Sequence, residues 1–253
     1  MTKIISVVAQ KGGTGKTTTV LELAYQLSII KNYTIVVIDL DGLATATKQL
    51  TGHKNHKSGI YDTIVYSTLI EKTLVPAHDF WKNTLVSPGD MRLDDCDEKI
   101  QKTLIAKEQI LNRAISNLVN KVDFILIDTP GELKERAVNA LVASTHYLLP
   151  ICPSEYGADA VSNVQYIANQ IKTSVNPKLE FMGILMTRVN SNSSNDLKDL
   201  IARIKVNHGD ELISTKVPFS NTIIGAQKQQ RPMSSLKNNA IGRAYKRVAE
   251  IIL

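Results

Sequence analysis

The 253-residue sequence has little of what stabilises secreted or membrane-spanning proteins. Its cysteines, Cys96 and Cys152, are too few for a disulfide framework, which favours a reducing cytoplasmic compartment. No run of about 18 apolar residues occurs, so we expect no transmembrane helix. The first residues lack the pattern of a signal peptide, because Lys3 precedes a short apolar stretch and then polar, glycine-rich sequence. The hydrophobic fraction of 43% instead predicts a globular protein with a substantial core.

The excess positive charge lies near the C-terminal end. The chain carries 30 basic and 24 acidic residues. The last 38 residues, 216–253, contain seven of the basic residues but one acid, Glu250, which leaves 23 of each sign in the rest of the chain. Such a segment is either a solvated face or a surface that binds a polyanion.

Short apolar runs alternate with segments of helical period. The runs do not alternate with polar residues, so each strand is expected to be buried on both faces, as in a parallel sheet between helices. With no repeat or long linker, the sequence predicts a single α/β domain over 1–253, a mostly parallel twisted sheet flanked by helices on both faces, and 216–253 as part of it. The predicted strands are 4–9, 34–41, 84–90, 124–131, 146–151 and 181–187. The predicted helices are 20–30, 58–72, 98–120 (with Leu104 among its inward residues), 155–174, 195–206 and 239–253.

The stretch GGTGKTT follows a predicted strand and opens a predicted helix. Glycines allow backbone N–H groups to surround phosphate oxygens, and the start of a helix adds partial positive charge. In such a loop Lys16 reaches the β- and γ-phosphates, Thr17 ligates Mg²⁺ and Thr18 binds the α-phosphate. The sequence therefore predicts an ATP and Mg²⁺ site that includes Gly12, Gly13, Thr14, Gly15, Lys16, Thr17 and Thr18.

Three carboxylates follow predicted strands. Asp39 and Asp41 are two residues apart, so both side chains can approach one Mg²⁺–phosphate centre. Asp128 ends the apolar run FILID and is the expected Walker B acid, which holds Mg²⁺ directly or through water. Paired acids at a strand end are also common as solvated caps, but the neighbouring loop favours a metal site. The predicted metal-binding residues are Thr17, Asp39 and Asp128.

The loop departs from the usual G-x-x-x-x-G-K-[ST] pattern, because Gln10 replaces the first glycine and Lys11 precedes the others. The stretch KGGTGKTT resembles the deviant Walker A loop, KGGxGKT[ST], of the ParA/MinD class of P-loop ATPases. The resemblance implies that Lys11 extends across a homodimer interface to the phosphates of the nucleotide in the other subunit. ATP binding would then drive dimerisation, and Lys11 would join Lys16 in neutralising charge during hydrolysis.

The strand-end segments resemble the same class. IDLDGLATAT is similar to the family pattern DxDPQGNAT, which implies that Asp39 lies near the metal and that Asp41 positions or activates the attacking water. Gly42, Leu43 and Ala44 replace Pro, Gln and Gly, so the detailed geometry of the water is open. DTPG, beginning at Asp128, resembles a switch that senses the γ-phosphate. The resemblance implies an ATPase that is slow alone, with Lys11, Lys16 and Asp41 as its catalytic residues.

Within the class, the segments 148–161, 183–192 and 217–236 resemble the ParA/Soj DNA-segregation ATPases. The resemblance implies Asn190 near the adenine, residues from Pro218 onwards over the base, and non-specific DNA binding by the ATP-bound dimer in the nucleoid. A ParB-like centromere-binding partner would stimulate hydrolysis, and plasmid or chromosome partition would be the function. No N-terminal helix-turn-helix is expected. The candidate DNA-binding residues are Arg188, Lys216, Lys228, Arg231, Lys237, Arg243, Lys246 and Arg247.

Three alternatives remain open. A MinD-like protein would anchor to a membrane through the amphipathic final helix, although no linker frees that helix and its apolar face is expected to pack on the domain. An iron–sulfur reductase would need two clustered cysteines, whereas Cys96 is expected to be a surface thiol and Cys152 a packed one. A nucleotide-gated scaffold without useful hydrolysis would be consistent with the altered segment 42–44 but not with the presence of Asp41.

Overall fold

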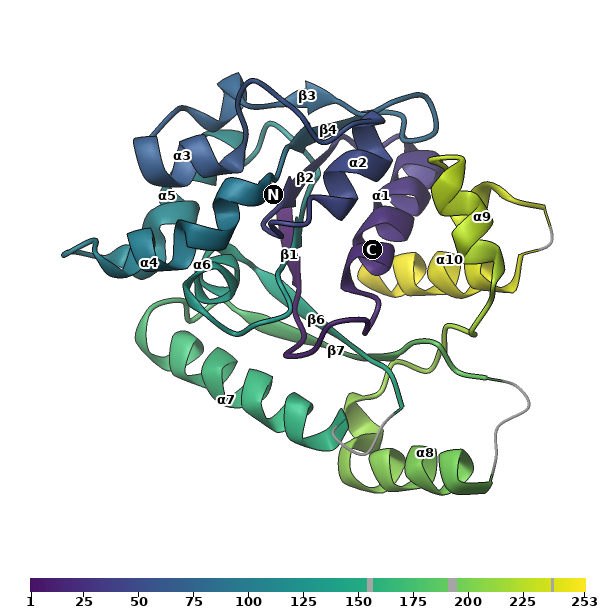
Figure 1. The fold of residues 1–253 in the computed structure, drawn as a ribbon. Coiled ribbons are helices and arrows are strands. Elements are labelled where there is room, and N and C mark those ends of the chain that lie inside the picture. Colours follow the sequence, from purple (N-terminus) through teal and green to yellow (C-terminus); the bar gives the residue numbers. More distant parts are fainter. Residues whose placement is uncertain (154–156, 191–194, 238) are drawn as a thin grey trace.

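The computed structural model describes residues 1–153, 157–190, 195–237 and 239–253. Its strands are β1 (Lys3–Val7), β2 (Ile35–Asp39), β3 (Val75–Pro76), β4 (Thr84–Ser87), β5 (Phe124–Asp128), β6 (His146–Ile151) and β7 (Glu180–Met186). They form one sheet in the order β3-β4-β2-β5-β1-β6-β7 (Figure 1). All neighbours pair in parallel except the short edge strand β3, which runs antiparallel to β4. The predicted mostly parallel α/β sheet is confirmed.

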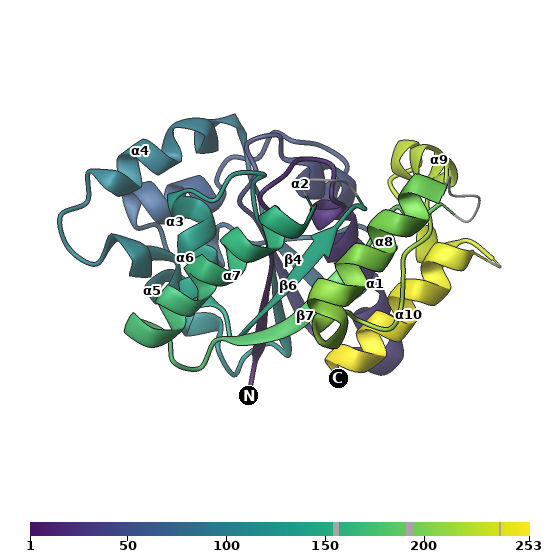
Figure 2. The ribbon, with the colours of Figure 1, turned by 90° about the horizontal axis from the view of Figure 1, so that it is seen from below.

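Helices cover both faces of this sheet (Figures 1 and 2). The helices are α1 (Lys16–Lys31), α2 (Thr45–Thr51), α3 (Ile60–Tyr66), α4 (Cys96–Gln101), α5 (Ile110–Ile115), α6 (Glu135–Ala143), α7 (Gly157–Ser174), α8 (Asn195–His208), α9 (Thr222–Lys228) and α10 (Ala240–Ile252). Short 3₁₀ helices also occur in the described ranges: η1 (Ile70–Lys72), η2 (Met91–Asp95), η3 (Lys107–Gln109), η4 (Ser116–Leu118), η5 (Gly209–Glu211) and η6 (Met233–Ser235).

Two layers of apolar side chains explain the unbroken hydrophobic runs of the strands. On one face of the sheet, Ile5 and Val7 of β1 pack with residues of α1, α2, α9 and α10. On the other face, Ile4 packs with residues of α3 to α6, and β6 and β7 pack against α7 and α8. Because successive side chains of a strand point to opposite faces, a strand between two helical layers must be apolar at every position.

The predicted helix over 98–120 is wrong as a single element. The segment forms α4, η3, α5 and η4, with a loop between α4 and η3. Ala106 has a left-handed φ of 48°, and Leu104, predicted to face inward, is 98% exposed. Contacts with α6 fix the next turn instead, because Lys107 pairs with Glu135 at 2.8 Å and the Leu111 N–H donates to Asn139 Oδ1 at 3.2 Å. Tertiary contacts therefore override the helical period here.

The predicted helix over 58–72 is also divided, into α3 and η1, by Ser67 with a left-handed φ of 56°. The predicted start of the 155–174 helix lies outside the described residues, and α7 agrees with the remainder. The other predicted strands and helices are found, most of them with ends that differ by a few residues; α1 and α8 are longer than predicted.

Buried polar contacts join α1 to the C-terminal part of the chain. The carboxylate of Glu22, 2% exposed, accepts hydrogen bonds from the N–H groups of Met233 at 2.7 Å and Ser234 at 3.0 Å, and a further short one from the Ser234 hydroxyl. Burial raises the pKa of Glu22, and these hydrogen bonds act in the opposite direction. A buried carboxylate with several donors fixes the turn η6 against α1.

We expect the substitution Glu22→Gln to lower the free energy of unfolding by about 1–3 kcal/mol, because an amide cannot accept from all three donors. Thermal unfolding followed by circular dichroism measures this loss as a decrease in Tm of roughly 2–4 °C per kcal/mol for a chain of this size. Glu250→Gln, on the exposed face of α10, is the matched control and should leave Tm unchanged. Equal values of Tm for both variants would contradict the anchoring role of Glu22.

Candidate nucleotide-binding site

The glycine-rich loop connects β1 to α1 in the way the motif predicts. Gly13 and Gly15 have φ values of 77° and 90°, a region that side-chain-bearing residues rarely adopt. The Thr187 hydroxyl, after β7, donates to the Thr14 carbonyl oxygen at 2.7 Å, and the Arg188 guanidinium donates to the Gly13 carbonyl oxygen at 3.0 Å. The residues that follow β7 therefore hold the loop in position.

Lys16 is folded back onto this loop. Its side chain is 7% exposed, and Nζ donates to the carbonyl oxygen of Lys11 at 3.0 Å. Burial lowers the pKa of Lys16, while the nearby charges of Asp128 and Asp41 raise it. A phosphate would compete well with a single neutral carbonyl for this ammonium group, since hydrogen bonds between two charged groups are the stronger ones.

Asp39 and Asp128 lie side by side at the ends of β2 and β5, where they are paired in register. Both are fully buried. Burial raises the pKa of Asp39 to about 6, and burial followed by the neighbouring Asp39 raises the pKa of Asp128 well above its usual value. A cation would stabilise the ionised forms of this pair.

The two carboxylates differ in their contacts. Asp39 Oδ2 accepts from the Thr47 N–H at 2.8 Å and the Thr47 hydroxyl at 2.7 Å, and Oδ1 accepts from the Asp41 N–H at 3.1 Å. Within the described part of the chain, neither buried oxygen of Asp128 has a hydrogen-bond partner, and the Thr17 hydroxyl approaches it without full hydrogen-bond geometry. Asp128 and Thr17 therefore fit a divalent cation, whereas the oxygens of Asp39 already accept hydrogen bonds.

A cavity of about 1080 Å³ opens above the loop. It is lined by loop residues 12, 13 and 15–18, by Asp41, and by Arg188 and residues 217–220 on the side of the chain after β7. The cavity contains Pro218, one of the predicted base-binding residues, but Asn190 is not among its lining residues. Thr14 is buried, and Lys11 lies exposed beside the cavity at the start of the loop. The volume is ample for a nucleoside triphosphate.

Asp41 faces this cavity within a tight turn. Its carboxylate Oδ1 accepts from the Leu43 N–H at 3.0 Å, and its carbonyl oxygen accepts from the Ala44 N–H at 2.9 Å. Ala44 has a left-handed φ of 50° and precedes α2. The unusual residues at 42–44 thus fold the chain around Asp41 and leave its side chain at the cavity.

The eight candidate DNA-binding residues occupy different environments. Arg188 contacts the loop at the cavity and lies 5.8 Å from the ring centre of Phe219. Arg231 packs over Phe80 at 5.1 Å and donates to the Ser235 hydroxyl at 2.9 Å. The others are exposed and form no ion pair with any described residue: Lys216, Lys228, Lys237, Arg243, Lys246 and Arg247.

Three further observations bear on the alternatives. The apolar face of α10 is buried against α1, including Tyr245 and Val248. None of the described helices is long and apolar enough to span a membrane. The expected exposure of the cysteines is wrong, because Cys96 is fully buried while Cys152 is half-buried. Burial raises the pKa of Cys96 to about 11, as expected for a packed thiol.

Comparison with known proteins identifies the family. A family model described as an AAA domain (AAA_31) matches residues 2–181. The sporulation initiation inhibitor protein Soj of Bacillus subtilis is 27% identical over 238 residues, which span 92% of this chain and 90% of Soj. The chromosome partitioning protein ParA of Myxococcus xanthus is 28% identical over 193 residues, 76% of this chain and 67% of that protein. The chain belongs to this AAA domain family and is a ParA/Soj-type P-loop ATPase.

The fold of this ParA/Soj-type ATPase is shared with solved structures. Cobyrinic acid a,c-diamide synthase of Mycobacterium smegmatis, solved with an ATP analogue and magnesium, superimposes with a TM-score of 0.84 over 99% of this chain and 93% of that chain. The identity is 20%, so this likeness concerns the fold.

The sequence motifs of the ATPase do not include several residues that shape the site. Arg136 and Asp97 form a buried ion pair of 3.0 Å at the cavity, and the Arg136 guanidinium also donates to the Leu40 carbonyl oxygen at 2.9 Å. Neither residue belongs to a motif, since they come from α6 and α4. Thr47 lies in the segment IDLDGLATAT and Thr187 in the segment 183–192, both of which resemble the family. The sequence pattern alone does not predict which groups these two side chains contact.

Proposed function

We propose that this ParA/Soj-type ATPase segregates plasmid or chromosomal DNA by nucleotide-controlled DNA binding. In the proposed cycle, ATP closes a homodimer in the cytoplasm and the dimer binds nucleoid DNA without sequence preference. A ParB-like centromere-binding partner then stimulates ATP hydrolysis, and the dimer is released. The partition function of its relative ParA supports this assignment.

The observation that carries the proposal is the packing of the basic helix α10 on α1, the helix that begins at the phosphate-binding loop (Figure 1). The Tyr245 hydroxyl lies 3.0 Å from the Thr19 hydroxyl, and the Gln26 side chain donates to the Gly242 carbonyl oxygen at 3.2 Å. A change at the loop can therefore reach the charged helix through direct contacts. We infer that 216–253 belongs to one domain with the ATP site.

The site supports binding of ATP with Mg²⁺. Asp128 and Thr17 would hold Mg²⁺, which neutralises charge on the phosphates. Lys16 would move from the Lys11 carbonyl oxygen to the β- and γ-phosphates, and the backbone of residues 12–18 would surround them. Pro218 and its neighbours would contact the base, together with Asn190 if the chain after β7 moves toward it.

Hydrolysis would depend on electrostatic stabilisation of the phosphoryl group. Lys16 contributes charge from its own subunit, and Lys11 from the partner subunit. Asp41 faces the cavity and would orient or activate the attacking water, while the fully buried Asp39 would lie near the metal. Positioned charges of this kind account for most catalysis in phosphoryl transfer.

The proposed function is tested by binding to a random-sequence DNA duplex with ATP, ADP or no nucleotide across a salt series, with anionic liposomes in parallel. We expect ATP-dependent binding whose affinity falls steeply with salt, because phosphate contacts release counterions. Liposome binding without DNA binding would contradict the proposal and favour a MinD-like membrane role.

A charge-removal variant makes this test specific to α10. Replacing Arg243, Lys246 and Arg247 together by alanine should reduce the slope of log affinity against log salt by about 2 to 3 for each subunit that contacts DNA, and so by up to about 5 for the dimer, or about 0.9 for each DNA phosphate that is no longer neutralised. The matched control replaces Lys57, Lys72 and Lys102, three exposed lysines outside the C-terminal segment, and should keep the wild-type slope. Equal slopes for the two triple variants would exclude α10 as the DNA-binding face.

A further inference from the structure

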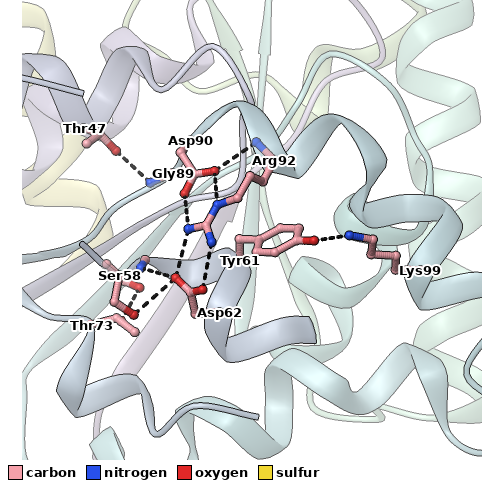
Figure 3. Close-up of polar contacts among 11 residues, drawn as sticks. Thr47, Ser58, Tyr61, Asp62, Thr73, Gly89, Asp90, Arg92 and Lys99 are labelled. Atoms are coloured by element: carbon pink, nitrogen blue, oxygen red, sulfur yellow. Dashed lines mark hydrogen bonds and ion pairs between the residues drawn. The ribbon is translucent and has the colours of Figure 1, made fainter. Parts of the chain in front are cut away.

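Thr47 of α2 connects the end of β2 with the chain that follows β4. Its side chain is fully buried. The hydroxyl donates to Asp39 Oδ2 at 2.7 Å. It accepts from the Gly89 N–H at 2.9 Å, a contact drawn in Figure 3. A hydroxyl has a single proton, so the hydrogen bond from Gly89 leaves that proton for Asp39. Thr47 does not line the cavity, so its hydroxyl would act on the reaction through the groups that it contacts, Asp39 and Gly89.

Gly89 packs so closely against Asp39 that the position of its N–H group is tightly restricted. A Cβ atom at this position would lie 2.5 Å from the Asp39 carbonyl oxygen and 3.1 Å from Asp39 Cγ. The backbone of Gly89 is therefore in direct contact with the end of β2. This close approach explains why glycine is required here, since its φ is not in the left-handed region.

The segment after β4 is fixed on its other side by α3. The Ile60 N–H donates to the Pro88 carbonyl oxygen at 2.8 Å. The Arg92 guanidinium joins Asp90 to Asp62, with contacts of 2.8–3.0 Å to both carboxylates (Figure 3). Asp62 in turn accepts from the Gly59 N–H at 2.9 Å at the start of α3. Gly89 is thus held from two sides and can serve as a fixed donor.

We propose that Thr47 is a positioning residue for ATP hydrolysis, whose hydroxyl holds the Asp39 carboxylate at the orientation that the Mg²⁺–phosphate centre requires. The inference rests on the proposed function, because it concerns the hydrolysis of ATP at the same site. Its basis is the pair of hydrogen bonds by which the Gly89 N–H donates to the Thr47 hydroxyl and that hydroxyl donates to Asp39. The Thr47 N–H adds a second hydrogen bond to the same oxygen at 2.8 Å, but a backbone donor remains in any variant.

The test compares Thr47→Val, which removes the hydroxyl at nearly constant size, with Thr47→Ser, which keeps it. Steady-state hydrolysis gives kcat and the KM values for ATP and Mg²⁺, and a fluorescent ATP analogue gives the dissociation constant. We expect Thr47→Val to lower kcat by about 10- to 100-fold, a typical cost of misplacing a reacting group. The dissociation constant of the analogue should change less than about twofold, because the loop is untouched. Thr47→Ser should restore most of kcat.

Thr63→Val is the matched control. Thr63 is also buried, in α3, and its hydroxyl has no hydrogen-bond partner among the described residues. This variant should retain wild-type kcat. If Thr47→Val does not fold, Thr47→Cys carries the test, because a thiol is a weak donor and should lower kcat in the same direction.

The outcomes separate the two proposals. Hydrolysis by the wild type with an undiminished kcat in Thr47→Val would overturn the role of Thr47 and leave the proposed function intact. A low kcat in Thr47→Val that Thr47→Ser does not restore would also overturn it, since the methyl group would then be the essential part. A wild type that binds ATP but does not hydrolyse it would overturn the proposed function, and the role of Thr47 with it.

Discussion

Replacing Lys11 by alanine is expected to abolish ATP-dependent dimerisation while leaving a folded monomer that still binds nucleotide. The Lys11 side chain is exposed at the start of the loop, whereas its carbonyl oxygen accepts from Lys16 at 3.0 Å. The substitution keeps that carbonyl, so the loop should retain its conformation. What is removed is the charge that, under the proposed function, would reach the nucleotide of the partner subunit.

The expected effect on the dimer is large. Hydrogen bonds to charged groups contribute about 1.5–3 kcal/mol each, and a twofold dimer loses two of them. The dissociation constant of the ATP-bound dimer should therefore rise by roughly 10²- to 10⁴-fold. Sedimentation velocity with a slowly hydrolysed ATP analogue measures this change directly, and a fluorescent nucleotide measures binding to the monomer.

Two further variants control for this result. Lys11→Arg keeps the positive charge and should retain a large part of the dimerisation. Lys31→Ala removes an exposed lysine at the other end of α1 and should behave as the wild type. An ATP-dependent dimer of wild-type stability in Lys11→Ala would contradict the proposal that this lysine acts across the interface.

The central part of the site can be predicted from the sequence because each of its parts is a short local pattern next to the end of a strand. The loop at 12–18 lies in the connection from β1 to α1, and Asp39 and Asp128 end their strands. In a parallel sheet the carboxyl ends of the strands lie at one edge, so local patterns are enough to bring these residues together. Pairing of β2 with β5 places Asp39 opposite Asp128, a detail that only the strand order provides.

The parts that the sequence does not predict depend on contacts between distant segments. Helices α2, α6 and α9 are absent from the predicted elements, because with seven to nine residues each is too short to show a clear helical period. Arg188 illustrates the same limit within the site. Its charge makes it a candidate for DNA binding, but the conformation of the chain after β7 brings its guanidinium to the Gly13 carbonyl oxygen, 175 positions earlier in the sequence. Composition identifies a charged residue, whereas the fold determines what it contacts.

In the C-terminal segment 216–253, the amino-acid composition alone predicts correctly that most of the basic side chains are exposed. Of its seven basic residues, Arg231 is engaged with Phe80 and Ser235, and the other six are exposed. The opposite face of α10 is buried against α1. An amphipathic helix with a packed apolar face has only its charged face available to a ligand, which favours a polyanion over the interior of a membrane.

Asp41→Asn is expected to abolish most ATP hydrolysis while preserving nucleotide binding. The amide keeps the acceptor for the Leu43 N–H, found at 3.0 Å, and the backbone N–H that donates to Asp39 is unchanged. The turn around residue 41 should therefore persist, and the loss is confined to the negative charge and the basic oxygen that faces the cavity. If Asp41 activates the attacking water, kcat should fall by about 10²- to 10⁴-fold, the usual contribution of a general base.

The same variant separates an ATPase cycle from a nucleotide-gated scaffold. With hydrolysis blocked, the ATP-bound dimer should accumulate and remain on DNA for longer than the wild type, as measured by dissociation from an immobilised duplex after free protein is removed. Asp94→Asn removes a charge from the wall of the same cavity and should leave both kcat and the dissociation rate unchanged. If kcat fell equally in the two variants, the total negative charge around the cavity, and not Asp41 itself, would control the reaction. Wild-type kcat in Asp41→Asn would instead favour a scaffold in which the altered turn at 42–44 no longer positions water.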